Sequence, residues 1–210
     1  MQSFKKILVL APHPDDGEFG AGASIHRWVS AGAEVRYVAF SPCLKSLPEG
    51  STSDLLGGEL KEAVQKLGMS EGQARLLDYP VREFPAHRQA ILEDLVQMRK
   101  DFRPDLVLVP NSTDIHQDHQ VIHEEAIRAF KHCSILGYEL PWNNMSVTTN
   151  YHVALDEENV QAKLDALHCY RSQEKRIYLA DGFLHGLARV RGVQVGHHLA
   201  EAFEVIRLVQ

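Results

Sequence analysis

The chain has 210 residues, of which 44% are hydrophobic and 24% charged, as in an ordinary globular domain. Its net charge of −6 offers no basic surface for nucleic acid, and no apolar run approaches the roughly 18 residues that a membrane-spanning helix needs. Three widely separated cysteines (Cys43, Cys133 and Cys169) indicate neither a disulfide framework nor a cysteine zinc site. The expected compartment is therefore the cytoplasm.

The predicted elements alternate between strand and helix as far as residue 131. Continuous apolar runs at 7–11 and 105–110 predict strands that are buried on both faces. The alternation predicts a Rossmann-like α/β domain over residues 1–210, with a mostly parallel sheet, helices on both faces and a less regular C-terminal part. The other expected elements, in chain order, are helix 21–31, strand 34–40, helix 57–67, strand 74–79, helix 87–102, helix 119–131, strand 147–155, helix 156–169 and strand 202–208.

The segment 41–56 has no regular pattern and contains Pro42, Pro48 and Gly50. Connections of this length without secondary structure are uncommon unless they are functional. Because it follows the carboxyl end of a predicted strand, we expect it to border a binding site.

Clusters of histidine and aspartate follow the two most apolar strands. Residues 13–18 read His-Pro-Asp-Asp-Gly-Glu, and residues 114–119 read Asp-Ile-His-Gln-Asp-His. Open parallel sheets bind ligands beyond the carboxyl ends of their strands. If the two strands are neighbours, the clusters face each other across one crevice.

The residue types in these clusters are those of a catalytic metal site. His13 and Asp16 are three residues apart in a tight turn, so both side chains can point to one place. A histidine from the second cluster would complete two histidines and a carboxylate with a fourth position open, as in catalytic zinc sites. Geometry alone allows either His119 or His123, four residues further on, as that histidine. Asp15 would then be free to act as a base.

The two motifs together resemble the PIG-L/LmbE-like family of zinc-dependent N-acetylglucosaminyl deacetylases, with supporting similarity at 59–68, 172–173 and 200–203. The resemblance implies a hydrolase that removes an N-acetyl or other short N-acyl group from an amino sugar or a nucleotide-linked amino sugar. Family relatives often assemble, so a homo-oligomer is included in the expectation. The implied roles are one Zn²⁺ per chain on His13, Asp16 and His119, Asp15 as general base, and His116 as a protonated oxyanion stabiliser oriented by Asp118. Glu18 is expected to support the site from behind the ligands.

One feature of many family members is missing. They carry a substrate-holding arginine just before the helix predicted at 57–67, whereas residues 37–74 of this chain contain none. A substrate with a phosphate or nucleotide diphosphate group would still need cationic contacts. The candidate substitutes are Arg82, Arg88, Arg189 and Arg191.

Three other functions are alternatives to a deacetylase. A dinucleotide-binding protein is disfavoured because the first turn lacks G-x-G-x-x-G and carries aspartates where pyrophosphate would lie. A two-metal phosphoesterase remains an alternative, and two metal ions per chain would indicate it. A non-catalytic sugar-binding relative is the second remaining alternative, although such a protein would have no need of Asp15.

Overall fold

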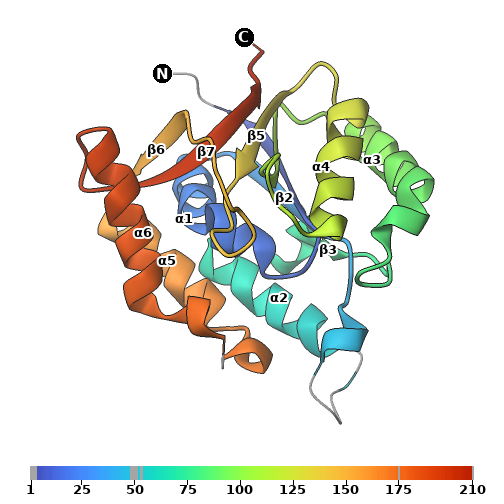
Figure 1. Cartoon of the computed structure of the whole chain (residues 1–210), viewed down its shortest axis with the longest axis horizontal. Coiled ribbons are helices and arrows are strands. Elements are labelled where there is room, and N and C mark those ends of the chain that lie inside the picture. Colours follow the sequence, from blue (N-terminus) through green and yellow to red (C-terminus); the bar gives the residue numbers. More distant parts are fainter. Residues whose placement is uncertain (1–3, 48–51, 53, 175, 210) are drawn as a thin grey trace.

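The computed structural model describes residues 4–47, 52, 54–174 and 176–209 (Figure 1). Short 3₁₀ turns at Leu44–Ser46, Glu71–Gln73, Phe84–His87, Arg171–Gln173 and Ile177–Leu179 connect the longer elements. The strands are β1 (Lys6–Ala11), β2 (Glu34–Ala39), β3 (Ala74–Leu76), β4 (Leu106–Pro110), β5 (Ser134–Tyr138), β6 (Tyr151–Leu155) and β7 (Leu199–Arg207). The helices are α1 (Asp16–Ser30), α2 (Leu55–Lys66), α3 (Arg88–Phe102), α4 (Gln117–Ala129), α5 (Glu157–Leu167) and α6 (Asp181–Gln194).

The strands form one sheet in the order β3-β2-β1-β4-β5-β7-β6. The first five are parallel, and β7 and β6 add an antiparallel edge. Chain order runs outward from β1 to β3 on one side and from β4 to β5 on the other. The order therefore reverses between β1 and β4, which is where open α/β sheets form their ligand crevice.

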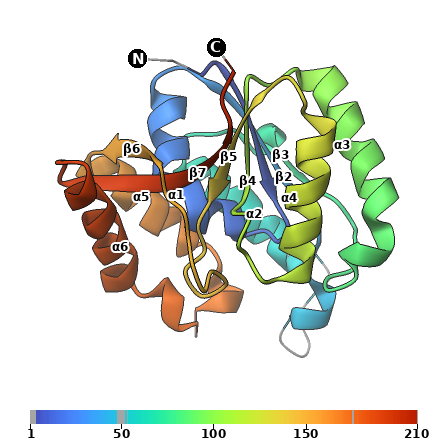
Figure 2. The ribbon, with the colours of Figure 1, turned by 45° about the horizontal axis from the view of Figure 1, so that its top comes forward.

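Helices cover both faces of the sheet (Figure 2). A hydrophobic core lies on each face of the sheet, and alternate side chains of β1 belong to one core or the other. Ile7 and Val9 pack with α1, α2, α5 and α6, whereas Leu8 and Leu10 pack with α3 and α4. This double burial explains why residues 7–11 of β1 and 106–110 of β4 are apolar throughout instead of alternating. No helix in the described part of the chain is both long and apolar enough to cross a membrane.

The predicted fold class is confirmed, with differences at particular elements. Helix α1 begins at Asp16, whereas the sequence predicted a start at residue 21. Gly17 and Gly20 weaken the helical pattern in the sequence, but the packing of the helix against two tyrosine rings requires glycine at both positions. A Cβ at Gly17 would lie 2.6 Å from the Tyr37 ring, and one at Gly20 would lie 2.2 Å from the Tyr138 ring. Strand β5 and helix α6 were not predicted. Part of the 41–56 segment, residues 48–51 and 53, lies outside the described residues.

Candidate active site

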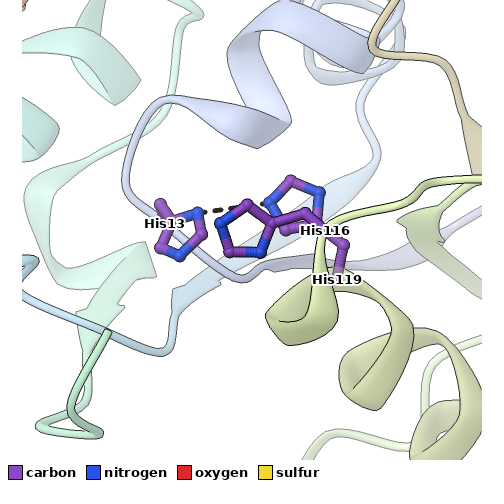
Figure 3. Close-up of side chains that lie close together, drawn as sticks. All are labelled: His13, His116 and His119. Carbon is purple, nitrogen blue, oxygen red and sulfur yellow. Dashed lines mark hydrogen bonds between the residues drawn. The ribbon is translucent and has the colours of Figure 1, made fainter. Parts of the chain in front are cut away.

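The two histidine–aspartate clusters lie side by side because β1 and β4 are paired. Ile7 is opposite Leu106 in this parallel pair, so both strands end at the same edge of the sheet. Beyond that edge, α1 begins in the first cluster and α4 in the second. The imidazoles of His13, His116 and His119 meet there (Figure 3).

These side chains form the floor of a cavity of about 320 Å³. Asp15 and Asp16 line it together with the three histidines. Cys43, Ser46 and Leu56 also line it, which supports the prediction that the 41–56 segment borders a binding site. The rest of the lining comes from Pro14, Val81, Arg82, Trp142, Asn143, Gln173, Arg176 and Tyr178.

Three atoms on this floor are spaced as metal ligands. His13 Nδ1 lies 3.1 Å from Asp16 Oδ2, and His119 Nε2 lies 3.2 Å from that oxygen and 3.2 Å from His13 Nδ1. A tetrahedral ion with bonds of about 2.0–2.1 Å separates its ligands by about 3.3 Å. The backbone N–H of His13 also donates to Asp16 Oδ2 at 2.8 Å, which fixes the carboxylate. The triangle fits a small divalent metal ion.

A carboxylate lies behind each of the two histidines. Asp114 Oδ2 is 2.7 Å from Nδ1 of His119, and Asp118 Oδ2 is 3.2 Å from Nε2 of His13. Metal-binding histidines usually donate the N–H of their second ring nitrogen to such a group, which sets the tautomer and the ring orientation. Asp118 is itself held by the backbone N–H groups of Arg82, at 2.6 Å, and Phe84, at 3.2 Å.

The electrostatics of the floor also favour a cation. Burial opposes a charged imidazole at His119, but the carboxylates of Asp16 and Asp114 prevail and raise its pKa to about 10. Burial likewise opposes ionisation of Asp16, yet the imidazoles of His119 and His13 hold its pKa well below the usual range. Without a metal, protons supply the positive charge that these buried carboxylates require. A divalent ion can replace them.

Asp15 has the properties of a general base. Burial and the neighbouring Asp16 carboxylate raise the pKa of Asp15 to about 6, against the attraction of Arg176 and His13. A carboxylate with a pKa this close to neutrality is ionised at pH 7 and still accepts a proton readily.

His116 differs from its predicted state. It is the N-cap residue of α4, and its Nδ1 accepts the backbone N–H of Asp118 at 3.1 Å. Burial and the nearby His119 and His13 imidazoles lower the pKa of His116 to about 4, outweighing the Asp118 carboxylate. The ring is therefore neutral at pH 7, with its proton on Nε2. The Asp118 carboxylate does favour the imidazolium, as predicted, but burial and the other two imidazoles prevail. That carboxylate faces His13, and the backbone N–H of Asp118 hydrogen-bonds to His116.

Glu18, predicted to support the site from behind the ligands, contacts the hydroxyls of two tyrosines beneath the turn. The hydroxyls of Tyr37 and Tyr170 each lie within hydrogen-bonding distance of the Glu18 carboxyl and of the Pro14 carbonyl, which is 2.7 and 2.6 Å from them. Burial raises the pKa of Glu18 to about 8 despite the two hydroxyls. At pH 7 the protonated carboxyl and the two phenols supply three protons to the network, which holds the turn that carries Asp15.

Of the four arginines predicted to bind substrate, Arg82 lines the cavity. The other three do not border it in the described structure. Arg88 pairs with Glu125 at 2.5 Å between α3 and α4, Arg191 pairs with Glu139 at 2.6 Å, and Arg189 contacts His198.

The sequence interpretation missed Arg176, which also lines the cavity. It follows the 3₁₀ turn Arg171–Gln173 in an irregular stretch where no periodicity marks the residues that face a site. The alternative ligand His123 points elsewhere: its Nδ1 donates to the carbonyl oxygen of Pro110 at 2.8 Å, which attaches α4 to the end of β4.

An aromatic stack forms one wall of the cavity. The rings of Trp142 and Tyr178 are stacked 4.0 Å apart, inclined by 12°, and Phe19 packs edge-on against both. The stack joins the connection after β5 to the 3₁₀ turn Ile177–Leu179. Trp142 is therefore packed on one face and still contributes to the cavity lining.

Comparison with known proteins agrees with the motifs. Diacetylchitobiose deacetylase of Thermococcus kodakarensis is 26% identical over 96% of this chain and 83% of its own length. The structure of N,N'-diacetylchitobiose deacetylase from Pyrococcus horikoshii, with a bound inhibitor, superposes with a TM-score of 0.78 at 24% identity, covering 97% of this chain and 84% of that one. The fold is shared with other reactions too. GalB of Pseudomonas putida, a 4-carboxy-2-hydroxymuconate hydratase, superposes with a TM-score of 0.79 at 21% identity, over 98% of both chains.

The family model for PIG-L, described as GlcNAc-PI de-N-acetylase, matches residues 8–130, which is more than half of the chain. The match includes most of β1, all of β4 and both histidine–aspartate clusters. The chain therefore belongs to the PIG-L family, as its motifs indicated.

Proposed function

We propose that the protein is a zinc-dependent deacetylase that hydrolyses the amide of an N-acetylated or otherwise short-chain N-acylated amino sugar. The observation that carries this proposal is the triangle of His13 Nδ1, Asp16 Oδ2 and His119 Nε2, with sides of 3.1–3.2 Å, in the cavity that Asp15 and His116 also line. The family and the relatives named above support amide hydrolysis as the reaction class.

His13, Asp16 and His119 would hold the zinc ion. Two histidines and one carboxylate leave a fourth position open for catalysis, which is typical of hydrolytic zinc sites. When bound, the ion supplies a Lewis acid that polarises the amide carbonyl and makes water more acidic.

The other groups on the floor move protons and stabilise charge. Asp15 takes the proton from the attacking water as the carbonyl carbon becomes tetrahedral. His116 donates its Nε2–H to the carbonyl oxygen while negative charge develops there, a contribution of about 3 kcal/mol for a well-placed donor. A neutral imidazole is suited to this role because its Nε2–H can donate a hydrogen bond to the carbonyl oxygen without transferring the proton. Asp15 then passes its proton to the departing nitrogen, and the products are acetate and a free amine.

The alternatives require other arrangements. A two-metal phosphoesterase needs ligands for a second ion about 3.5–4 Å from the first. Two of the neighbouring carboxylates, Asp114 and Asp118, are engaged behind His119 and His13. A non-catalytic sugar-binding protein would have no use for a carboxyl whose pKa is raised to about 6 on the cavity floor.

The test is a panel of N-acyl amino sugars, free and nucleotide-linked, incubated with zinc-loaded protein while released primary amine is measured. We expect amine from at least one substrate and one zinc ion per chain by elemental analysis. Two ions per chain with phosphate release would favour the phosphoesterase. A protein that binds these sugars and releases no amine would overturn the proposed reaction.

The compartment and the assembly state are part of the proposal. Cys43, Cys133 and Cys169 are unpaired and buried, as suits a reducing compartment, and we retain the cytoplasm. A homo-oligomer stays a prediction, to be checked by light scattering.

A further inference from the structure

Two guanidinium groups line the active-site cavity without a carboxylate partner. Arg82 comes from the connection between β3 and α3, and Arg176 lies far away in sequence, before the 3₁₀ turn Ile177–Leu179. In the described structure, no carboxylate oxygen lies within 4.0 Å of either group, whereas Arg88 and Arg191 are closely paired. Each of these guanidinium groups places a positive charge at the cavity wall, where an anionic group of a ligand can bind.

Arg82 is held in place by its backbone. Its φ of 70° is in the left-handed region, which is unfavourable for an arginine and persists only where the surroundings impose it. The cause is visible: its N–H donates to Asp118 Oδ2 at 2.6 Å, and the same oxygen orients His13. The carboxylate that positions a metal ligand thus also places the Arg82 side chain at the cavity. Its Nη2 lies 3.4 Å from the Lys45 carbonyl, so most of its donors stay free.

Arg176 is positioned by the aromatic wall. Its Nη1 hydrogen-bonds to the Tyr178 hydroxyl, and its guanidinium carbon is 5.6 Å from the centre of that ring. Tyr178 is fixed in turn by its stack with Trp142. Such packing reduces the side-chain entropy that an arginine loses on binding a ligand.

We propose that Arg82 and Arg176 form an anion-binding subsite, and that the substrate is an N-acylated amino sugar carrying a phosphate or carboxylate group. The fork of a guanidinium matches the paired oxygens of both anions, with donors in one plane. The amide to be cleaved is neutral, so it makes no demand for these two cations. The proposal rests on the deacetylase function and specifies its substrate class.

The experiment compares neutral and anionic substrates of one sugar. N-acetylglucosamine is assayed beside its 1-phosphate, its 6-phosphate and its glycoside with glycolic acid, and kcat/KM is measured by amine release. We expect at least one anionic substrate to be preferred about tenfold or more, since charge-assisted hydrogen bonds are the strong ones. The anion that the subsite prefers is identified by comparing kcat/KM for the two phosphorylated sugars with kcat/KM for the glycolic acid glycoside.

The variants Arg82→Gln and Arg176→Gln should each reduce that preference about tenfold to a hundredfold, because kcat/KM should fall further for the anionic substrate than for the neutral sugar. Arg103→Gln is the matched control, because Arg103 is also left-handed, with φ of 53°, and lies exposed at the end of α3. It should leave the preference unchanged.

Two results would overturn the subsite. One is equal turnover of neutral and anionic sugars by the wild-type protein. The other is an equal loss on both substrates in the variants, which would mean that the arginines serve the Asp15 carboxylate. If no sugar releases amine, the proposed function fails. The subsite is then tested separately by calorimetry, which compares the binding affinities of glucosamine 6-phosphate and glucosamine. Tighter binding of the phosphate that is lost in Arg176→Gln supports it, and equal affinity refutes it.

Discussion

Oδ2 of Asp118 lies 3.2 Å from Nε2 of His13, so a carboxylate that follows β4 orients an imidazole that follows β1. The sequence interpretation paired Asp118 with His116, as the family resemblance implies. The structure shows that its carboxylate acts across the crevice, and this changes which variants should disturb the metal and which should disturb the chemistry.

Asp118→Asn should weaken zinc binding about tenfold to a hundredfold, because the amide no longer supplies a charged acceptor behind His13. Competition with a chromophoric chelator measures the affinity. Asp94→Asn is a suitable control, since Asp94 is a half-buried carboxylate on α3 that accepts from Tyr79. Equal affinity in Asp118→Asn and wild type would contradict the supporting role.

Asp15→Asn should lower kcat by about 10²- to 10⁴-fold, the usual contribution of a general base, with zinc content near normal. In the wild-type protein the raised pKa of about 6 means that Asp15 becomes protonated and inactive below that pH. Binding of zinc nearby lowers this value, so the acid limb of the kcat profile should lie at or below pH 6. A variant that lost both zinc and activity would show that Asp15 is a ligand.

Metal binding should release protons. His119, with its pKa raised to about 10, and His13, whose pKa is also raised, must be deprotonated to bind a metal. Affinity should therefore increase with pH through the neutral range. Calorimetry at pH 7 in buffers of different ionisation enthalpy counts the protons, and we expect at least one per zinc ion. An enthalpy that is independent of the buffer would be inconsistent with these protonation states.

Tyr170→Phe should reduce the free energy of unfolding by about 1–2 kcal/mol, because it leaves buried acceptors on Pro14 and Glu18 short of a donor. Loosening of the turn should also lower kcat. Urea unfolding measures the first effect and amine release the second. In the control Tyr151→Phe, at a half-buried strand position, both should change little.

A buried ion pair between Lys163 of α5 and Glu201 of β7 contacts the backbone of helix α1. Glu201 accepts the N–H groups of Ala23, at 3.2 Å, and Ser24, at 2.7 Å, while Lys163 donates to the Phe19 carbonyl and to Glu201. Lys163→Met should destabilise the fold by about 3–5 kcal/mol, because Glu201 would be left as an unpaired buried charge. Adding Glu201→Gln should recover part of that loss in urea unfolding. No recovery would mean that lost packing, and not charge, explains the effect.

The parallel core was predictable because its signals are local. Apolar runs mark β1 and β4, and three-to-four-residue periodicity marks α3 and α4. Strand β5 was not predicted from the sequence, because Gly137 interrupts a strand of five residues. Its neighbours in the sheet, β4 and β7, come from distant parts of the chain. Helix α6 was not predicted because three glycines weaken its apolar pattern.

The site was predictable only in part for the same reason. A motif names residues such as His13 and His119, but the partner of each outer nitrogen depends on packing across the crevice. The protonation of His116 depends on its N-cap geometry and burial, neither of which the sequence displays. Arg176 is a single residue in an irregular stretch, so only three-dimensional structure brings it to the cavity.

The two parts of the cavity have separate origins in the chain. Its floor belongs to the ends of β1 and β4, whereas Trp142, Arg176 and Tyr178 come from connections that follow β5 and α5. Hydrolysis and selectivity therefore depend on different segments of the chain. Transplanting those two connections, together with the β3–α3 connection that carries Arg82, between proteins of this architecture should transfer preference for one sugar over another while the hydrolytic machinery stays intact.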